Sequence, residues 1–81
     1  MNTHEIKVPQ LGEGLREVTI VALLKEPGEW VERDEPIAEV ETEKSTVMLE
    51  APVSGTIAAW SCKAGDTIAI GAILTSIQIT N

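Results

Sequence analysis

The chain has 81 residues, a formal net charge of −7 and a hydrophobic content of 43%, which is typical of one small folded domain. A negative surface repels phosphate backbones and anionic lipids, which argues against binding to nucleic acids or membranes. One cysteine, Cys62, and one histidine, His4, leave no internal disulfide, metal-ligand cluster or histidine-based catalytic site to assemble. We therefore expect a single soluble domain over residues 1–81, without catalytic residues or a metal.

Short β-strands separated by turns are predicted along the chain, because apolar residues alternate and frequent glycines and prolines leave no room for a long helix. The two glycines of the LGEGL stretch, residues 11–15, predict a loop, since closely spaced glycines are unfavourable inside a strand. Pro27-Gly28 is a strong turn signal. Such a series is typical of an all-β sandwich or barrel. The predicted strands cover residues 4–9, 17–25, 36–42, 45–51, 55–63 and 72–79.

An internal repeat is the most informative feature of the sequence. A shift of 37 positions places VTIVALLKEPGEWV over GTIAAWSCKAGDTI, so that Ile20 meets Ile57 and Gly28 meets Gly65. The same shift places PIAEVE over ILTSIQ. We interpret the repeat as two similar half-domains packed face to face, which buries one apolar face of each.

Lys44 lies in a glutamate-rich passage, and the repeat indicates its position in the fold. Its counterpart is residue 81, so one half has a hairpin where the other half has the free chain ends. In a two-fold arrangement the hairpin and the ends lie at opposite ends of the molecule. A lysine at the hairpin tip is then as far as possible from any tether, which suits a carrier.

The strand register supports a two-residue turn made of Glu43 and Lys44. With that turn Val40 opposes Val47 and Ala38 opposes Leu49 on one apolar face, whereas one extra loop residue mixes the faces. Glu-Lys is not a favoured pair for such a tight turn, and backbone strain accepted at this position would hint at a functional tip.

The chemistry open to Lys44 is limited by its surroundings. An exposed turn beside carboxylates favours the charged ammonium, which makes the lysine a poor nucleophile or base unless another enzyme acts on it. From the residues alone, a solvated surface lysine remains the ordinary interpretation.

Several stretches together resemble the lipoyl domains of the acyltransferase (E2) components of 2-oxo acid dehydrogenase complexes: VETEKSTVMLEAPVSGTI, PQLGEGLREVTIV, AGDTIAIGAIL and the 37-residue repeat. The resemblance covers residues 5–79 and implies a flattened β-barrel of two four-stranded antiparallel sheets with quasi-two-fold symmetry. It implies that a separate lipoate-attaching enzyme joins lipoate covalently to Lys44. It further implies that the modifying enzyme or a partner recognises the surroundings of this lysine, namely Glu43, Ser45, Leu11, Gly12, Glu13 and Gly14.

The chemistry implied by the resemblance belongs to the cofactor, so the domain is expected to be a non-catalytic carrier. The lipoyl arm is acylated by a thiamine-diphosphate-dependent decarboxylase (E1), delivers the acyl group to coenzyme A in the acyltransferase core, and is reoxidised by dihydrolipoamide dehydrogenase (E3). The expected parent is a longer E2 chain with this domain in its N-terminal part and a homo-oligomeric core; the isolated domain is expected to be monomeric. The expected location is the cytoplasm of a prokaryote, or the mitochondrial matrix after removal of a transit peptide.

Two alternatives remain open beside the lipoyl domain. A biotinyl carrier domain shares the fold and the hairpin lysine, but its lysine is typically flanked by methionines, whereas Glu43 and Ser45 flank Lys44 and Met48 is too distant. An unmodified β interaction module would make Lys44 incidental. A self-contained small enzyme has no catalytic constellation to support it. The tip also departs from the commonest lipoyl pattern, Asp-Lys-Ala, by conservative changes on both sides of the lysine.

Overall fold

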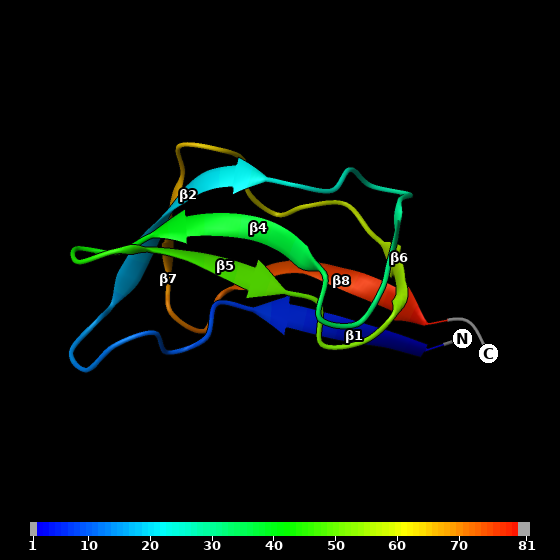
Figure 1. Ribbon diagram of the computed structural model, residues 1–81, viewed down its shortest axis with the longest axis horizontal. Coiled ribbons are helices and arrows are strands. Elements are labelled where there is room, and N and C mark those ends of the chain that lie inside the picture. Colours follow the sequence, from blue (N-terminus) through cyan, green and yellow to red (C-terminus); the bar gives the residue numbers. More distant parts are fainter. Residues whose placement is uncertain (1, 80–81) are drawn as a thin grey trace.

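The computed structural model describes residues 2–79, which form an all-β barrel flattened into two sheets (Figure 1). Each sheet has four antiparallel strands, in the orders β1-β8-β6-β3 and β5-β4-β2-β7. The predicted fold class and the two four-stranded sheets are therefore confirmed. The strands are β1 (Asn2–Lys7), β2 (Glu17–Leu23), β3 (Trp30–Val31), β4 (Pro36–Glu41), β5 (Thr46–Glu50), β6 (Gly55–Ile57), β7 (Thr67–Ala69) and β8 (Ile73–Ile79).

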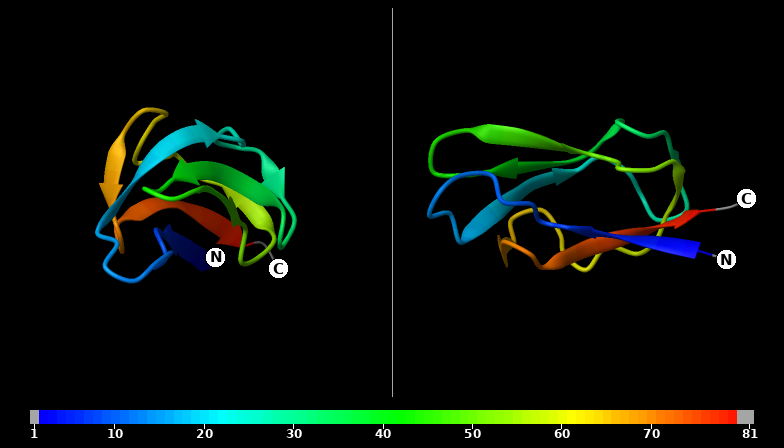
Figure 2. Two further views of the ribbon diagram at one scale, coloured as in Figure 1. Left: turned by 60° about the vertical axis from the view of Figure 1, so that its left-hand side comes forward. Right: turned by 90° about the horizontal axis from the view of Figure 1, so that it is seen from below.

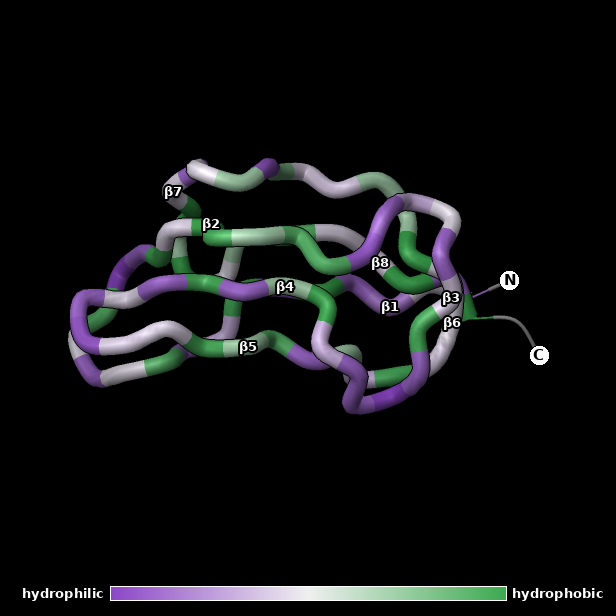
Figure 3. Tube along the Cα trace, turned by 45° about the horizontal axis from the view of Figure 1, so that its top comes forward, coloured by the Kyte–Doolittle hydropathy of each residue, from purple (hydrophilic) through white to green (hydrophobic). Residues whose placement is uncertain are grey.

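The core between the sheets consists of aliphatic side chains, and its members are related by the repeat. Ile20 and its counterpart Ile57 are each 1% exposed. In Figure 3 the hydrophobic segments lie along the strands, whereas the loops at both ends of the molecule are mostly hydrophilic. Other fully buried counterparts are Ile37 with Leu74 and Val40 with Ile77.

The two halves do not form one sheet each, so the prediction of two half-domains packed face to face needs correction. The first half contributes β2 and β4 to one sheet and the short strand β3 to the other, while the second half contributes β6, β8 and β7 in the reciprocal way. The halves therefore interlock, because each of them supplies an edge strand to a sheet that the other half dominates.

Exchanged hydrogen bonds at two glycine turns hold this interlock. The Gly28 N–H donates to the Ile57 carbonyl at 2.8 Å, and 37 positions further on the Gly65 N–H donates to the Ile20 carbonyl at 2.7 Å. Both glycines have positive φ, 93° and 95°, which is accessible to glycine at little cost. Hydrogen bonds also run in the opposite direction, from the strands to the turns: the Ile20 N–H donates to the Asp66 carbonyl, and the Ile57 N–H donates to the Glu29 carbonyl.

The predicted strand over residues 55–63 was wrong beyond Ile57. After this residue the chain bends across the sheet, and the carbonyls of Ala58 and Ala59 both accept a hydrogen bond from the buried Thr75 hydroxyl, at 3.0 Å each. The indole N–H of Trp60 donates to the Lys25 carbonyl at 2.8 Å. The sequence pattern also missed β3 and β7, which are only two and three residues long and are defined by their partner strands.

The chain ends and the β4–β5 hairpin lie at opposite ends of an elongated molecule of 38 × 20 × 19 Å (Figures 1 and 2). Antiparallel pairing of β1 with β8 places Asn2 opposite Ile79, so the described chain enters and leaves at one end. This arrangement confirms the predicted separation of hairpin and chain ends. Residue 81, the predicted counterpart of Lys44, lies outside the described residues.

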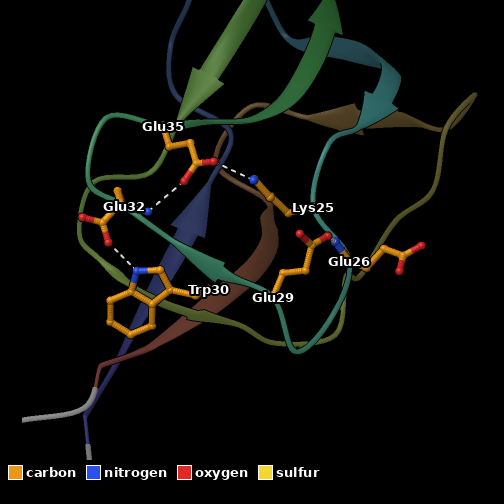
Figure 4. Close-up of polar contacts among 6 residues, drawn as sticks. All are labelled: Lys25, Glu26, Glu29, Trp30, Glu32 and Glu35. Atoms are coloured by element: carbon orange, nitrogen blue, oxygen red, sulfur yellow. Dashed lines mark hydrogen bonds and ion pairs between the residues drawn. The ribbon is translucent and has the colours of Figure 1, made fainter.

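A cluster of polar contacts stabilises the end of the barrel near the chain ends (Figure 4). The Lys25 ammonium and the Glu35 carboxylate form an ion pair with Nζ and Oε2 at 2.6 Å. The other Glu35 oxygen accepts a hydrogen bond from the Glu32 N–H at 2.9 Å, and the Glu32 carboxylate accepts one from the Trp30 indole. The hydrogen bond from Lys25 holds the pKa of Glu35 below its ordinary value, and the same contact raises the pKa of Lys25.

Gly55 is expected to tolerate no side chain. A Cβ built at this position lies 2.5 Å from the Gln78 carbonyl oxygen and 2.5 Å from Ile77 Cγ2, so Gly55→Ala requires strand β6 to move away from β8. We expect a loss of about 1–3 kcal/mol in the free energy of unfolding, measured by urea denaturation. Gly12→Ala is the control, because a Cβ there meets no atom within 4 Å. Equal stability of the two variants would contradict the prediction.

Replacing Glu35 is expected to change the pH dependence of stability. The lowered pKa means that the folded state binds fewer protons than the unfolded state, so the stabilisation is present near neutral pH and is lost as pH falls through the folded-state pKa. Glu35→Gln should therefore lower Tm near neutral pH and have little effect in strong acid. Thermal melts across this range test the prediction, with the exposed Glu26→Gln as control; matching profiles for both variants would refute it.

Candidate functional site

The β4–β5 hairpin has the register that the sequence predicts. Val40 pairs with Val47 and Ala38 with Leu49, and on the other face Glu39 pairs with Met48. The first two pairs face the core, whereas Met48 is 50% exposed. The hairpin is therefore anchored along one face, and Glu43 and Lys44 form its tip.

The hydroxyl of Thr42 organises the turn, and this residue was not predicted as part of the site. Its Oγ1 accepts hydrogen bonds from the N–H groups of Lys44 and Ser45, at 3.2 and 3.1 Å. A backbone hydrogen bond from Thr42 N–H to the Ser45 carbonyl, at 2.8 Å, closes the pair below the tip. Threonine hydroxyls stabilise turns in this way, so a threonine just before the two turn residues is the sequence signal for the contact.

The tip accommodates Glu43 and Lys44 without left-handed backbone strain. Among the described residues, Asp34 is the one non-glycine residue with positive φ, so neither Glu43 nor Lys44 adopts the left-handed conformation of the favoured tight turns. The hydroxyl of Thr42 replaces the backbone carbonyl as acceptor, which removes the need for Asn-Gly at the tip. The turn therefore positions Lys44 even though Glu-Lys is not a favoured pair for the usual tight turns.

The side chain of Lys44 is exposed, and its ammonium forms no hydrogen bond or ion pair within residues 2–79. Neither burial nor a second cation desolvates or activates this amine. The arrangement can present an amine to a modifying enzyme, but it cannot perform amine chemistry on its own. An exposed lysine on a hydrogen-bonded turn fits covalent attachment of an acyl group, because the bond to Nζ can form without breaking a hydrogen bond or ion pair of the ammonium.

The loop between β1 and β2 lies beside the hairpin tip, at the same end of the molecule in Figures 1 and 2. Together they line a cavity of about 250 Å³, which we call the loop–hairpin cavity. The structure thus brings together all seven residues that the sequence analysis assigned to the site, and it adds Leu15 and Thr42. The lining residues are Leu11, Gly12, Glu13, Gly14, Leu15, Thr42, Glu43, Lys44 and Ser45.

A second, more acidic depression of about 290 Å³ lies along the other flank of the hairpin. It is lined by β2 and β4 and includes the carboxylates of Glu17, Glu41 and Glu43 beside Thr67. Because Glu43 lines both depressions, the lysine tip has acidic side chains close on one side and the loop on the other.

Other candidates for chemistry do not line the loop–hairpin cavity, although His4 shares a groove with strand β5 of the hairpin. His4 is an exposed residue of β1. Burial raises the pKa of the Cys62 thiol, and the Asp66 carboxylate adds to the effect, so the thiol is held in its unreactive protonated form. Within residues 2–79, no group of three or more His, Cys, Asp or Glu side chains is placed to hold a metal ion. The described part of the chain also has no helix of the length and hydrophobicity needed to cross a membrane.

A barrel that presents an exposed lysine on a hairpin tip is the architecture of a cofactor-carrier domain, and comparisons with known proteins agree. The family model described as "Biotin-requiring enzyme", for biotin and lipoyl attachment, matches residues 4–77. The solution structure of the lipoyl domain of the 2-oxoglutarate dehydrogenase complex from Azotobacter vinelandii is similar, with a TM-score of 0.81 and 33% identity. The match covers 96% of this chain and 99% of that one.

Two curated bacterial relatives extend the comparison. The succinyltransferase component of the 2-oxoglutarate dehydrogenase complex from Bartonella vinsonii is 42% identical over 76 residues, 94% of this chain. The lipoamide acyltransferase component of the branched-chain alpha-keto acid dehydrogenase complex from Pseudomonas putida is 37% identical over 79 residues, 98% of this chain. The chain spans only 18% and 19% of the length of these relatives.

The chain belongs to the biotin- and lipoyl-attachment family, and within it to the lipoyl domains of 2-oxo acid dehydrogenase acyltransferase (E2) components. The family implies lipoate attached covalently to a lysine, and the domain is a carrier rather than an enzyme by itself. The lipoyl prediction is thereby confirmed, and the biotinyl alternative is not favoured.

Removing the Thr42 hydroxyl is expected to loosen the tip. Thr42→Val keeps the shape of the side chain but leaves the N–H groups of Lys44 and Ser45 without their acceptor. We expect about 1 kcal/mol lower stability and faster amide hydrogen exchange at both positions. Thr42→Ser retains the hydroxyl and is expected to behave like the original domain. Indistinguishable exchange rates in the Val and Ser variants would show that the hydroxyl does not hold the turn.

Proposed function

We propose that Lys44 is the lipoylation site and that the domain acts as a swinging carrier in a 2-oxo acid dehydrogenase complex. The observation that carries the proposal is the position of this lysine: its side chain is exposed, its ammonium forms no hydrogen bond or ion pair within residues 2–79, and it lies on a hairpin tip opposite the chain ends. A separate lipoate-attaching enzyme forms the amide with Nζ. The bound group supplies the disulfide–dithiol chemistry that carries an acyl group.

The proposed partners follow from this role. A thiamine-diphosphate-dependent decarboxylase (E1) loads the arm, the acyltransferase core transfers the acyl group to coenzyme A, and dihydrolipoamide dehydrogenase (E3) restores the disulfide. The names of the relatives support this level of description, because they include components of the 2-oxoglutarate, branched-chain and pyruvate dehydrogenase complexes. The protein contributes presentation and tethering, which raise the concentration of the arm at several active sites.

We assign recognition roles to the residues around Lys44. Glu43 and Ser45 flank it at the tip, and Leu11, Gly12, Glu13 and Gly14 form the loop on the other side of the loop–hairpin cavity. Because these residues lie together around Lys44, their position supports recognition of this surface by the modifying enzyme or by E1. The carboxylates of Glu43, Glu41 and Glu17 favour partners with basic surfaces around their active-site entrances.

The parent protein is proposed to be a longer E2 chain that contains this domain in its N-terminal part and assembles into a homo-oligomeric core, whereas the isolated domain is monomeric. The fraction of the relatives that the chain covers, 18% for the Bartonella protein, supports a multidomain parent. The relatives include bacterial proteins and a mitochondrial one from Schizosaccharomyces pombe, which supports a location in the prokaryotic cytoplasm or in the mitochondrial matrix.

Co-expression of the domain with a lipoate-attaching enzyme in the presence of lipoate tests the proposal. Intact mass is expected to increase by one lipoyl group, and Lys44→Arg should abolish the increase. Lys63→Arg, at another exposed lysine, is the matched control and should retain it. An unmodified domain under these conditions would defeat the carrier proposal, and a biotin increment with a biotin-attaching enzyme would favour the biotinyl alternative.

A further inference from the structure

The loop–hairpin cavity has Lys44 itself in its wall. Its volume is about 250 Å³, and its other walls come from the loop that follows β1. A group attached to Nζ is therefore tethered at the cavity, and entry requires no diffusion from solution. Tethering gives such a group a high effective concentration at any site within its reach.

The walls of the cavity differ in chemistry. On the loop side, Leu11 and Leu15 are half-buried and pack against the core, so they expose part of their side chains beside the hairpin. On the hairpin side, Thr42 and Ser45 contribute hydroxyls, and two acidic residues, Glu43 of the hairpin and Glu13 of the loop, also line the cavity. An arm with an amide at its root, a short hydrocarbon chain and a ring containing two sulfur atoms has both polar and apolar parts to place against these two kinds of wall.

Both walls are held in place before any arm is attached. In the loop, Gly12 N–H donates to the Gln10 side-chain oxygen at 3.2 Å, and Leu15 N–H donates to the Gly12 carbonyl at 3.1 Å. Gly14 has a φ of 77°, which glycine adopts readily, and this residue turns the chain back toward β2. A preformed site loses little conformational freedom on binding, which favours even a weak occupant.

We infer that the loop–hairpin cavity is a resting site for the lipoyl arm of the same domain, in which the hydrocarbon chain and the disulfide ring lie against Leu11 and Leu15. This inference rests on the proposed lipoylation of Lys44. Burial of the apolar chain against the two leucines removes it from water, whereas an arm extended from the tip exposes it fully. The loop then has two alternating functions, holding the arm at rest and presenting a surface to partners when the arm leaves.

NMR of the isotope-labelled domain tests the resting site without any partner enzyme. Unmodified and lipoylated samples are compared after intact mass has established the attachment. We expect the amide signals of residues 11–15 to shift on lipoylation, and we expect nuclear Overhauser effects between the disulfide-ring protons and the methyl groups of Leu11 and Leu15.

The outcomes separate this inference from the proposed function. A lipoyl mass increment without these Overhauser effects overturns the resting site and leaves the carrier role intact, whereas absence of the increment overturns both. Leu11→Ser should weaken the contacts of the arm, and Leu24→Ser is the matched control, because this leucine is 40% exposed and lies outside the cavity. Contacts that persist unchanged in Leu11→Ser would also overturn the inference. If Leu11→Ser fails to fold, the nuclear Overhauser effects in the unsubstituted lipoylated domain still test the resting site.

Discussion

The structure depends on the pair of exchanged hydrogen bonds at the two glycine turns. Gly28 in one half and Gly65 in the other each donate to a carbonyl of the opposite half, so neither half can complete its sheet alone. This constraint matters in a chain with an aromatic content of 2%, in which the core consists of small aliphatic side chains and is limited in size. Because the two halves interlock, their small groups of aliphatic side chains form one shared core.

The interlocked barrel allows the β4–β5 hairpin to present an exposed residue at its tip. Only one face of the β4–β5 hairpin is needed for packing, so its end extends beyond the sheets and leaves Lys44 in solvent. The hydroxyl of Thr42 then fixes the turn without a glycine or a strained residue. The protein thus supplies a defined position for an exposed amine.

The alternation of apolar and polar residues predicted those features of the fold that depend on neighbouring residues in the sequence. The alternation around Val40 and Val47 fixed the hairpin register, because a shift of one residue would turn every side chain to the wrong face. The edge strands β3 and β7 escaped detection, since their identity comes from strands in the other half. The hydrogen bonds to the Thr42 hydroxyl were not predicted, because the apolar alternation shows which face a residue occupies and not which backbone groups its hydroxyl contacts. The proximity of the loop to Lys44 came from the family resemblance rather than from any pattern.

The side-by-side exit of β1 and β8 has a mechanical consequence. Tension applied through a tether would act on Asn2 and Ile79, which are paired partners at the open end of the β1–β8 ladder. Such a load peels the two strands apart one hydrogen bond at a time instead of shearing many bonds together. Resistance to pulling on these two ends is therefore low along this direction.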